Sequence, residues 1–206
     1  LYVVDTASHA LKGVAAGAGA QPYSAVFNGS DNQAFILNCA AECGGVDPVV
    51  IPPAINGASI QPLDLTNVLA PVLGPKIPLP AGAGATAGLL SGSTLYVAGT
   101  LTPGTGSLAV FNVSTRSFST VVLNIPDGLH TRMVLTSNNR LYVGSTGCLA
   151  VPVGASFQGC LAIFDTTKGV TQTAITMPTF GTFRTGFSVT GLQPISGRNV
   201  IYVVEG

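Results

Sequence analysis

The chain has 206 residues, of which 47% are hydrophobic and only 8% are charged, and its formal net charge is zero. This length is enough to bury a core, and without a cluster of basic residues the chain is not expected to bind nucleic acid or an anionic membrane surface. Glycine, proline or a polar residue interrupts every apolar stretch before about 18 residues, so the sequence predicts no membrane span.

Two short apolar phrases recur along the chain. The first follows a turn rich in Gly, Asn or Ser, at residues 34–37, 95–98, 141–144 and 201–204. The second ends in Asp or Asn and is followed by Ser or Thr, at residues 1–5, 60–64, 108–112 and 161–165. Short polar side chains at such places bind nearby backbone groups and turn the chain, which we favour over a role as metal ligands.

The segments between these phrases complete a repeat of four strands, A to D. Strand A is predicted at residues 23–27, 87–90, 132–136 and 186–190, and strand D at residues 11–15, 72–79, 118–125 and 171–177. No segment has a convincing helical period. The sequence therefore predicts an all-β fold, a β-propeller of four-stranded antiparallel blades, as one domain or part of one over residues 1–206.

The order of the predicted strands is C–D, then A–B–C–D three times, then A–B. Two arrangements fit this order. The leading C–D pair could complete the trailing A–B pair and close a ring of four blades, or the chain is a part of a larger propeller. We favour the second, in which strand edges at both ends need covering by other chain or another molecule.

Four cysteines fall near the ends of predicted strands. Cys148 closes a strand B and Cys160 opens the following strand C, so their sulfurs flank one connecting loop. Cys39 and Cys43 lie at the start of the long loop to Ser59. We expect the local disulfides Cys39–Cys43 and Cys148–Cys160, which imply an oxidising compartment. A zinc site is the alternative, but neither pair has the two-residue spacing of a zinc knuckle.

The Tyr-Val phrase, followed by a strand that ends in Asp-Thr before a Thr- or Ser-rich turn, resembles the YVTN-type repeat propellers of bacterial surfaces. The best matches are Leu1-Tyr2-Val3-Val4-Asp5-Thr6, Leu141-Tyr142-Val143-Gly144 and Ile163-Phe164-Asp165-Thr166-Thr167. The Tyr-Val-Thr-Asn string itself is absent, and the pattern is also similar to lactonase-like and quinoprotein-dehydrogenase-like propellers. The resemblance implies a secreted or cell-surface bacterial protein, often without known catalysis. The oxidising compartment that the disulfides imply is the periplasm, the cell surface or the outside of the cell.

In a propeller, the D–A and B–C loops share one face around the central channel, where lactonase-like relatives gather metal ligands or acid–base groups. On this chain the face would receive Asp127, His130, Arg132, Phe180, Phe183, Arg184, Glu42 and Asp47. This is our candidate binding face. We assign no catalytic or metal-binding residue there, because the first two D–A loops, residues 16–22 and 80–85, offer almost only Ala, Gly and Pro. Structural roles, namely hydrogen bonds within loops and packing between sheets, also explain the presence of these residues.

Two functions follow as hypotheses. The first is a non-enzymatic extracellular or cell-surface propeller, a structural, adhesion or assembly module that binds protein or glycan partners or assembles with itself through strand edges, with no cofactor. The alternative is a lactonase-like hydrolase or dehydrogenase with its site at the channel mouth. Asn28-Gly29-Ser30 and Asn112-Val113-Ser114 match the N-glycosylation pattern, although turn chemistry also favours Asn at both places.

Overall fold

The computed structural model describes residues 2–14, 21–43, 57–102, 105–125, 130–145, 159–176 and 189–205. These residues are all-β apart from one short 3₁₀ turn, η1 (Ala40–Cys43). Within these ranges, no helix has the length and apolarity needed to cross a membrane.

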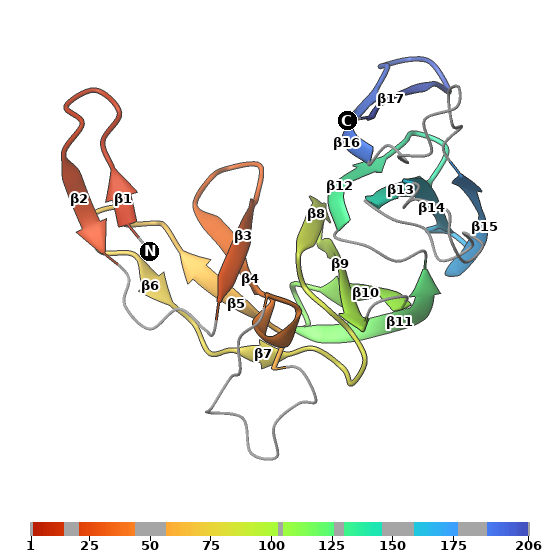
Figure 1. The fold of residues 1–206 in the computed structure, drawn as a ribbon. Helices are drawn as coiled ribbons and strands as arrows, with labels where there is room; N and C mark the ends of the chain where they lie inside the picture. The colour runs from red at the N-terminus through yellow and green to blue at the C-terminus, as the bar shows by residue number, and fades with distance from the viewer. Residues whose placement is uncertain are drawn as a thin grey trace.

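The strands form five antiparallel sheets that follow one another along the chain (Figure 1). The first sheet, the N-terminal half-blade, pairs β1 (Tyr2–Val4) with β2 (Leu11–Val14). The last, the C-terminal half-blade, pairs β16 (Val189–Pro194) with β17 (Ile201–Glu205). Between them lie blades 1, 2 and 3, each in the order A–B–C–D. The predicted fold class and strand order are therefore confirmed.

The three blades have the following strands. Blade 1 holds β3 (Pro22–Phe27), β4 (Gln33–Asn38), β5 (Ser59–Asp64), β6 (Val72–Leu73) and β7 (Ile77–Pro78). Blade 2 holds β8 (Ala87–Ser91), β9 (Thr94–Thr102), β10 (Thr105–Asn112) and β11 (Ser117–Ile125). Blade 3 holds β12 (His130–Leu135), β13 (Arg140–Ser145), β14 (Cys160–Asp165) and β15 (Val170–Thr176).

The A strands lie at the inner side of the assembly. β3 contacts β8, β8 contacts β12, and β12 contacts β16, so these strands form an inner rim from which the sheets extend. In Figure 1 the sheets follow an arc, with the two half-blades at its opposite ends. Because β1 and β17 belong to separate sheets, the described residues do not form the closed ring of four blades, one of the two predicted arrangements.

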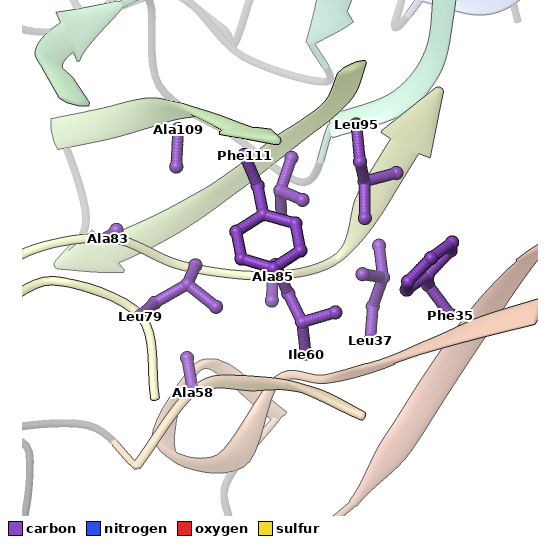
Figure 2. Close-up of a cluster of buried hydrophobic side chains, with 11 residues drawn as sticks. Phe35, Leu37, Ala58, Ile60, Leu79, Ala83, Ala85, Leu95, Ala109 and Phe111 are labelled. Atoms are coloured by element: carbon purple, nitrogen blue, oxygen red, sulfur yellow. The ribbon is translucent and has the colours of Figure 1, made fainter. Parts of the chain in front are cut away.

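Neighbouring blades are joined by apolar side chains that alternate along the strands. Phe35 and Leu37 of β4 point toward blade 2 and pack with Leu95 of β9 and Phe111 of β10 (Figure 2). On the other face of blade 2, Leu108 and its neighbours pack against blade 3. Burial of each such large side chain stabilises the fold by about 1.5–3 kcal/mol. The core is therefore a series of layers between sheets.

Polar turns end the C strands as the sequence predicts. The Oδ1 atoms of Asp5, Asp64, Asn112 and Asp165 accept hydrogen bonds of 2.8 to 3.1 Å from backbone N–H groups two or three residues later. In the A–B turns, Asp31, Gly92, Asn139 and Gly197 adopt a positive φ, the left-handed conformation that such hairpin turns need.

Two strand boundaries differ from the prediction. Strand D of blade 1, expected to run continuously over residues 72–79, is split into β6 and β7. Pro75 between them has no N–H to donate to a sheet, while the Gln61 side-chain amide binds the Gly74 carbonyl at 3.0 Å.

The last strand A was predicted at residues 186–190, but β16 runs over Val189–Pro194, and residues 186–188 lie outside the described part of the chain. The hydrogen bond from Ile195 N to Val200 O closes the hairpin. Pro194 therefore lies opposite Ile201, and the strand continues to the turn.

Candidate functional site

The predicted binding face is described only in part. Asp47, Asp127, Phe180, Phe183 and Arg184 lie outside the described residues. His130 is the first residue of β12, and Arg132 lies on the same strand with an exposed side chain. Glu42 lies in η1, in the B–C loop of blade 1. The convergence of these eight residues therefore stays a prediction.

Glu42 is held in place by the disulfide at the start of its loop. Cys39 and Cys43 are joined, with Cα atoms 5.7 Å apart, across the single turn of η1. This confirms the predicted pair. Cys160 is also disulfide-bonded, and Cys148, its predicted partner, lies outside the described residues.

The Glu42 carboxylate links blade 1 to blade 2. Its Oε1 accepts hydrogen bonds from Thr100 N at 2.5 Å and Thr86 Oγ1 at 3.1 Å, and its Oε2 accepts one from Ala85 N at 3.1 Å. Hydrogen bonds to an ionised acceptor are stronger than those between neutral groups. Glu42 therefore stabilises the contact between the two blades at this face.

The loop that Glu42 binds is packed tightly onto blade 2. Ala83, Ala85 and Thr86 are buried, and Gly84 N donates to Ser107 Oγ at 2.9 Å. A Cβ at Gly99 would overlap the backbone of Gly84 and Ala85 and lie 2.6 Å from Glu42 Oε2. The small residues of this loop are thus required for close packing.

This arrangement gives Glu42 a structural role that its sequence position did not reveal. Its carboxylate receives one donor from β9 of blade 2, Thr100, and two from the loop before β8, Ala85 and Thr86. Within the residues that the structure describes, no three His, Cys, Asp or Glu side chains are grouped so that they could hold a metal ion.

A second candidate site lies on the opposite rim, where the A–B and C–D turns meet. A cavity of about 380 Å³ opens between blade 1 and the C–D turn of blade 2. Ligand sites usually have volumes of roughly 300–1,000 Å³. The cavity is lined by Asn32, Gln33, Pro62, Asp64, Thr66, Val72, Gly74 and Arg116.

The cavity combines hydrogen-bond acceptors and donors. The hydrogen bonds from the Thr66 side chain and backbone lower the pKa of Asp64, so this carboxylate is ionised at neutral pH. The Asn32 amide is fixed because its Oδ1 accepts from Asn28 Nδ2 at 2.7 Å and from Ser30 Oγ at 3.0 Å. Its Nδ2 is then the atom able to donate to a ligand.

Arg116 brings a positive charge to the cavity from an unusual backbone position. Its φ is 54°, and the same place in the C–D turn is occupied by Gly169 in blade 3, with a φ of 68°. A left-handed conformation favours glycine over a residue with a side chain. Sequence reasoning missed Arg116, although an alignment of the C–D turns on Asp165 and Asn112 places it opposite Gly169.

The sheet order, the inner rim of A strands and the layered core define the chain as a set of β-propeller blades. The solved structure with a TM-score above 0.5 supports this fold. The hydrazine synthase of Kuenenia stuttgartiensis is similar with a TM-score of 0.62 and 14% identity, over 88% of this chain and 49% of that chain. The β-propeller domain of the Trilobed protease from Pyrococcus furiosus is similar with a TM-score of 0.40 and 10% identity, over 82% of this chain and 46% of that chain.

The chain thus spans about half the length of these structures. At 14% identity the likeness shows the fold alone. No protein-family model and no curated protein sequence matches the chain.

Proposed function

We propose that the chain is a non-enzymatic, extracellular binding module, and that its ligand is a neutral glycan bound in the cavity between blades 1 and 2. The observation that carries this proposal is the lining of the cavity, which includes Asp64, Asn32 and Arg116. Vicinal hydroxyl groups of a sugar can donate to a carboxylate and accept from amide and guanidinium groups.

Other features are compatible with this function. Pro62 and Val72 add apolar surface for the faces of a sugar ring. The Cys39–Cys43 disulfide suits an oxidising compartment. A glycan partner, secretion or surface display, and the YVTN-type repeat all stay predictions, and so does the lactonase-like alternative.

The proposal is tested by screening the chain against an array of neutral glycans and measuring the best ligand by calorimetry. Arg116→Ala and Asp64→Asn are each expected to weaken binding by about tenfold or more, since each removes a charged hydrogen bond. Arg198→Ala is the matched control, because Arg198 is also an exposed arginine in a turn but does not line the cavity.

Three results would contradict the proposal. The first is that no glycan on the array binds, and the second is binding that Arg116→Ala and Asp64→Asn leave unchanged. The third is conversion of the glycan to a product, detected by mass spectrometry after incubation, since this would show that the chain is an enzyme.

A further inference from the structure

Three hydrogen-bond donors lie close together where the loop before β8 meets β9. This donor cluster consists of the Ala85 and Thr100 N–H groups and the Thr86 hydroxyl, and all three bind the Glu42 carboxylate. The loop and the strand are also bonded to each other, because Thr86 N donates to Ala98 O at 2.9 Å. The position of the donors therefore does not depend on Glu42 alone.

Glycines border the space that the carboxylate occupies. A Cβ at Gly84 or at Gly99 would lie 2.6 Å from Glu42 Oε2, so no side chain fits there beside the carboxylate. Both glycines are buried. Main-chain N–H groups that converge in a concave space bind anions, and glycine lets the main chain approach a ligand closely. The space therefore has the features of an anion site.

The donors define which kind of anion the space takes. Oε1 of Glu42 accepts from Thr86 and Thr100, and Oε2 accepts from Ala85. Both oxygens of an ionised carboxylate accept hydrogen bonds, whereas an amide would turn an N–H group toward one of the donors. Hydrogen bonds to the ionised group are also the stronger ones. A carboxylate is therefore the chemical class that fits.

Blade 1 presents its carboxylate on a short turn that a disulfide closes. Cys39 and Cys43, which flank Glu42, are separated by only four positions in the sequence. A disulfide across so short a loop restricts the unfolded chain less than one across a long loop. Its main effect is therefore local, on the position of η1. A ligand held on such a turn competes with free anions at a high effective concentration.

We infer that the donor cluster is a binding site for a carboxylate, and that Glu42 is the ligand that blade 1 holds in it. In the unmodified chain the tethered ligand joins the two blades and keeps free anions out. When the Glu42 side chain is shortened, a small free carboxylate binds the same donors in its place. This site is separate from the glycan cavity, because none of its residues lines that cavity.

Formate, whose single carbon replaces Cδ of Glu42, tests the inference in the Glu42→Ala variant. Thermal unfolding is followed at neutral pH while sodium formate replaces sodium chloride at constant ionic strength. A ligand that binds only the folded state raises the melting temperature. We expect a rise of about 3–6 °C when formate reaches about ten times its dissociation constant.

Three controls separate this site from a general effect of the salt. Glu42→Gln fills the same space with a neutral amide, so its melting temperature should not respond to formate. The unmodified chain should not respond either, because Glu42 already occupies the donors. Formamide has nearly the shape of formate but no charge, and it is expected to leave the Glu42→Ala variant unchanged.

A donor variant locates the bound formate. Thr86→Val, added to Glu42→Ala, removes the hydroxyl donor while it keeps the shape of the side chain. The dissociation constant for formate is expected to rise about tenfold or more, since a hydrogen bond to a charged group is lost. Thr94→Val in the same background is the matched control, because Thr94 is at the other end of β9 and should leave formate binding unchanged.

The inference is overturned if formate does not raise the melting temperature of Glu42→Ala, if Glu42→Gln or formamide gives the same rise, or if Thr86→Val leaves formate binding unchanged. A Glu42→Ala chain that is unfolded in chloride must fold in formate, and failure to fold in both salts also overturns it. The glycan test uses the cavity on the opposite rim, so its result is independent of these outcomes.

Discussion

At the scale of single residues, the carboxylate and amide side chains of this nearly uncharged chain accept hydrogen bonds from backbone N–H groups. Glu42 binds groups of β9 and of the loop before β8, and Asp5, Asp64 and Asp165 fix the turns that follow them. Each of these carboxylates replaces water with N–H or O–H donors of the protein. Their contribution to stability therefore depends on their charge and on their acceptor atoms.

We expect Glu42→Gln to destabilise the fold by about 1–3 kcal/mol, because the amide presents an N–H where two backbone donors and one hydroxyl now meet a carboxylate. The free energy of unfolding, measured with a chemical denaturant, checks this. Asp31→Asn, in an exposed turn, serves as the control. A loss equal to that of the control would contradict the structural role of Glu42.

The capping carboxylates predict a dependence of stability on pH. Hydrogen bonds from the Ser8 and Ala7 N–H groups lower the pKa of Asp5. Burial opposes ionisation of Asp165, but the N–H groups of Lys168 and Thr167 and the Arg140 guanidinium outweigh it and lower its pKa. Arg140 Nη1 lies 3.0 Å from Asp165 Oδ2.

The pKa values of these carboxyl groups are lower in the folded state than in the unfolded state. Above about pH 4, near the unfolded pKa of Asp, the ionised carboxylates therefore stabilise the fold fully. This stabilisation is lost as the pH falls through the folded pKa values. Asp165→Asn should therefore lose less stability than the unmodified chain between neutral and acid pH. Asn112→Asp, at the same place in blade 2, should lose more. Melting temperatures measured across this range check both, and equal slopes for all three chains would contradict the prediction.

At the scale of elements, close approach between strands and loops decides which residues fit. Gly144 of β13 packs directly against β16, and a Cβ at Gly144 would lie 2.6 Å from Val189 Cγ1. Gly99 of β9 packs directly against the loop before β8. At both places a glycine lets a neighbouring segment pack directly on the strand.

We expect Gly99→Ala to destabilise the fold by about 3 kcal/mol or more, because its Cβ overlaps backbone atoms that cannot move without breaking the Glu42 hydrogen bonds. Gly29→Ala is the control, since a Cβ there meets no atom within 4 Å. It should change stability by less than about 0.5 kcal/mol. Denaturant unfolding of both variants checks the difference, and a tolerated Gly99→Ala would show that the loop can move away from β9.

Some features of this fold can be predicted from the sequence, and others cannot. The strands follow from the sequence because local turn residues, such as Asn139 and Asp165, mark their ends. The partners of Glu42 do not, because Ala85 and Thr100 are 43 and 58 residues away and bind through backbone N–H groups, which every residue type carries. The cavity was also missed, since it depends on how two blades are placed side by side.

At the scale of the whole molecule, stability is unevenly distributed along the arc. β16 packs against β12 and β13, whereas β1 and β2 contact mainly each other. The layers on either side of blade 2 are the most continuous parts of the core. Contacts in such an arrangement are made between neighbours, as in other repeat proteins.

Hydrogen exchange should reveal this gradient. The amides of β1 and β2 are expected to exchange fastest and those of β9 and β10 slowest, because local opening of a two-stranded sheet breaks few contacts. Exchange measured by mass spectrometry on dilute protein checks the order. Protection of β1 equal to that of β9 under these conditions would contradict it.

In each of the three blades, the residue after the terminal Asp or Asn of strand C donates its N–H to a carbonyl of the A–B turn, for example Thr166 N to Asn139 O at 3.0 Å. This bond has a consequence for how such a chain can evolve. Because these rim bonds lie within a single blade, duplication or loss of one unit leaves the rim bonds of every other unit intact. Natural variants of this chain should therefore differ in length by whole multiples of a blade, roughly 40–50 residues, more readily than by insertions within a strand.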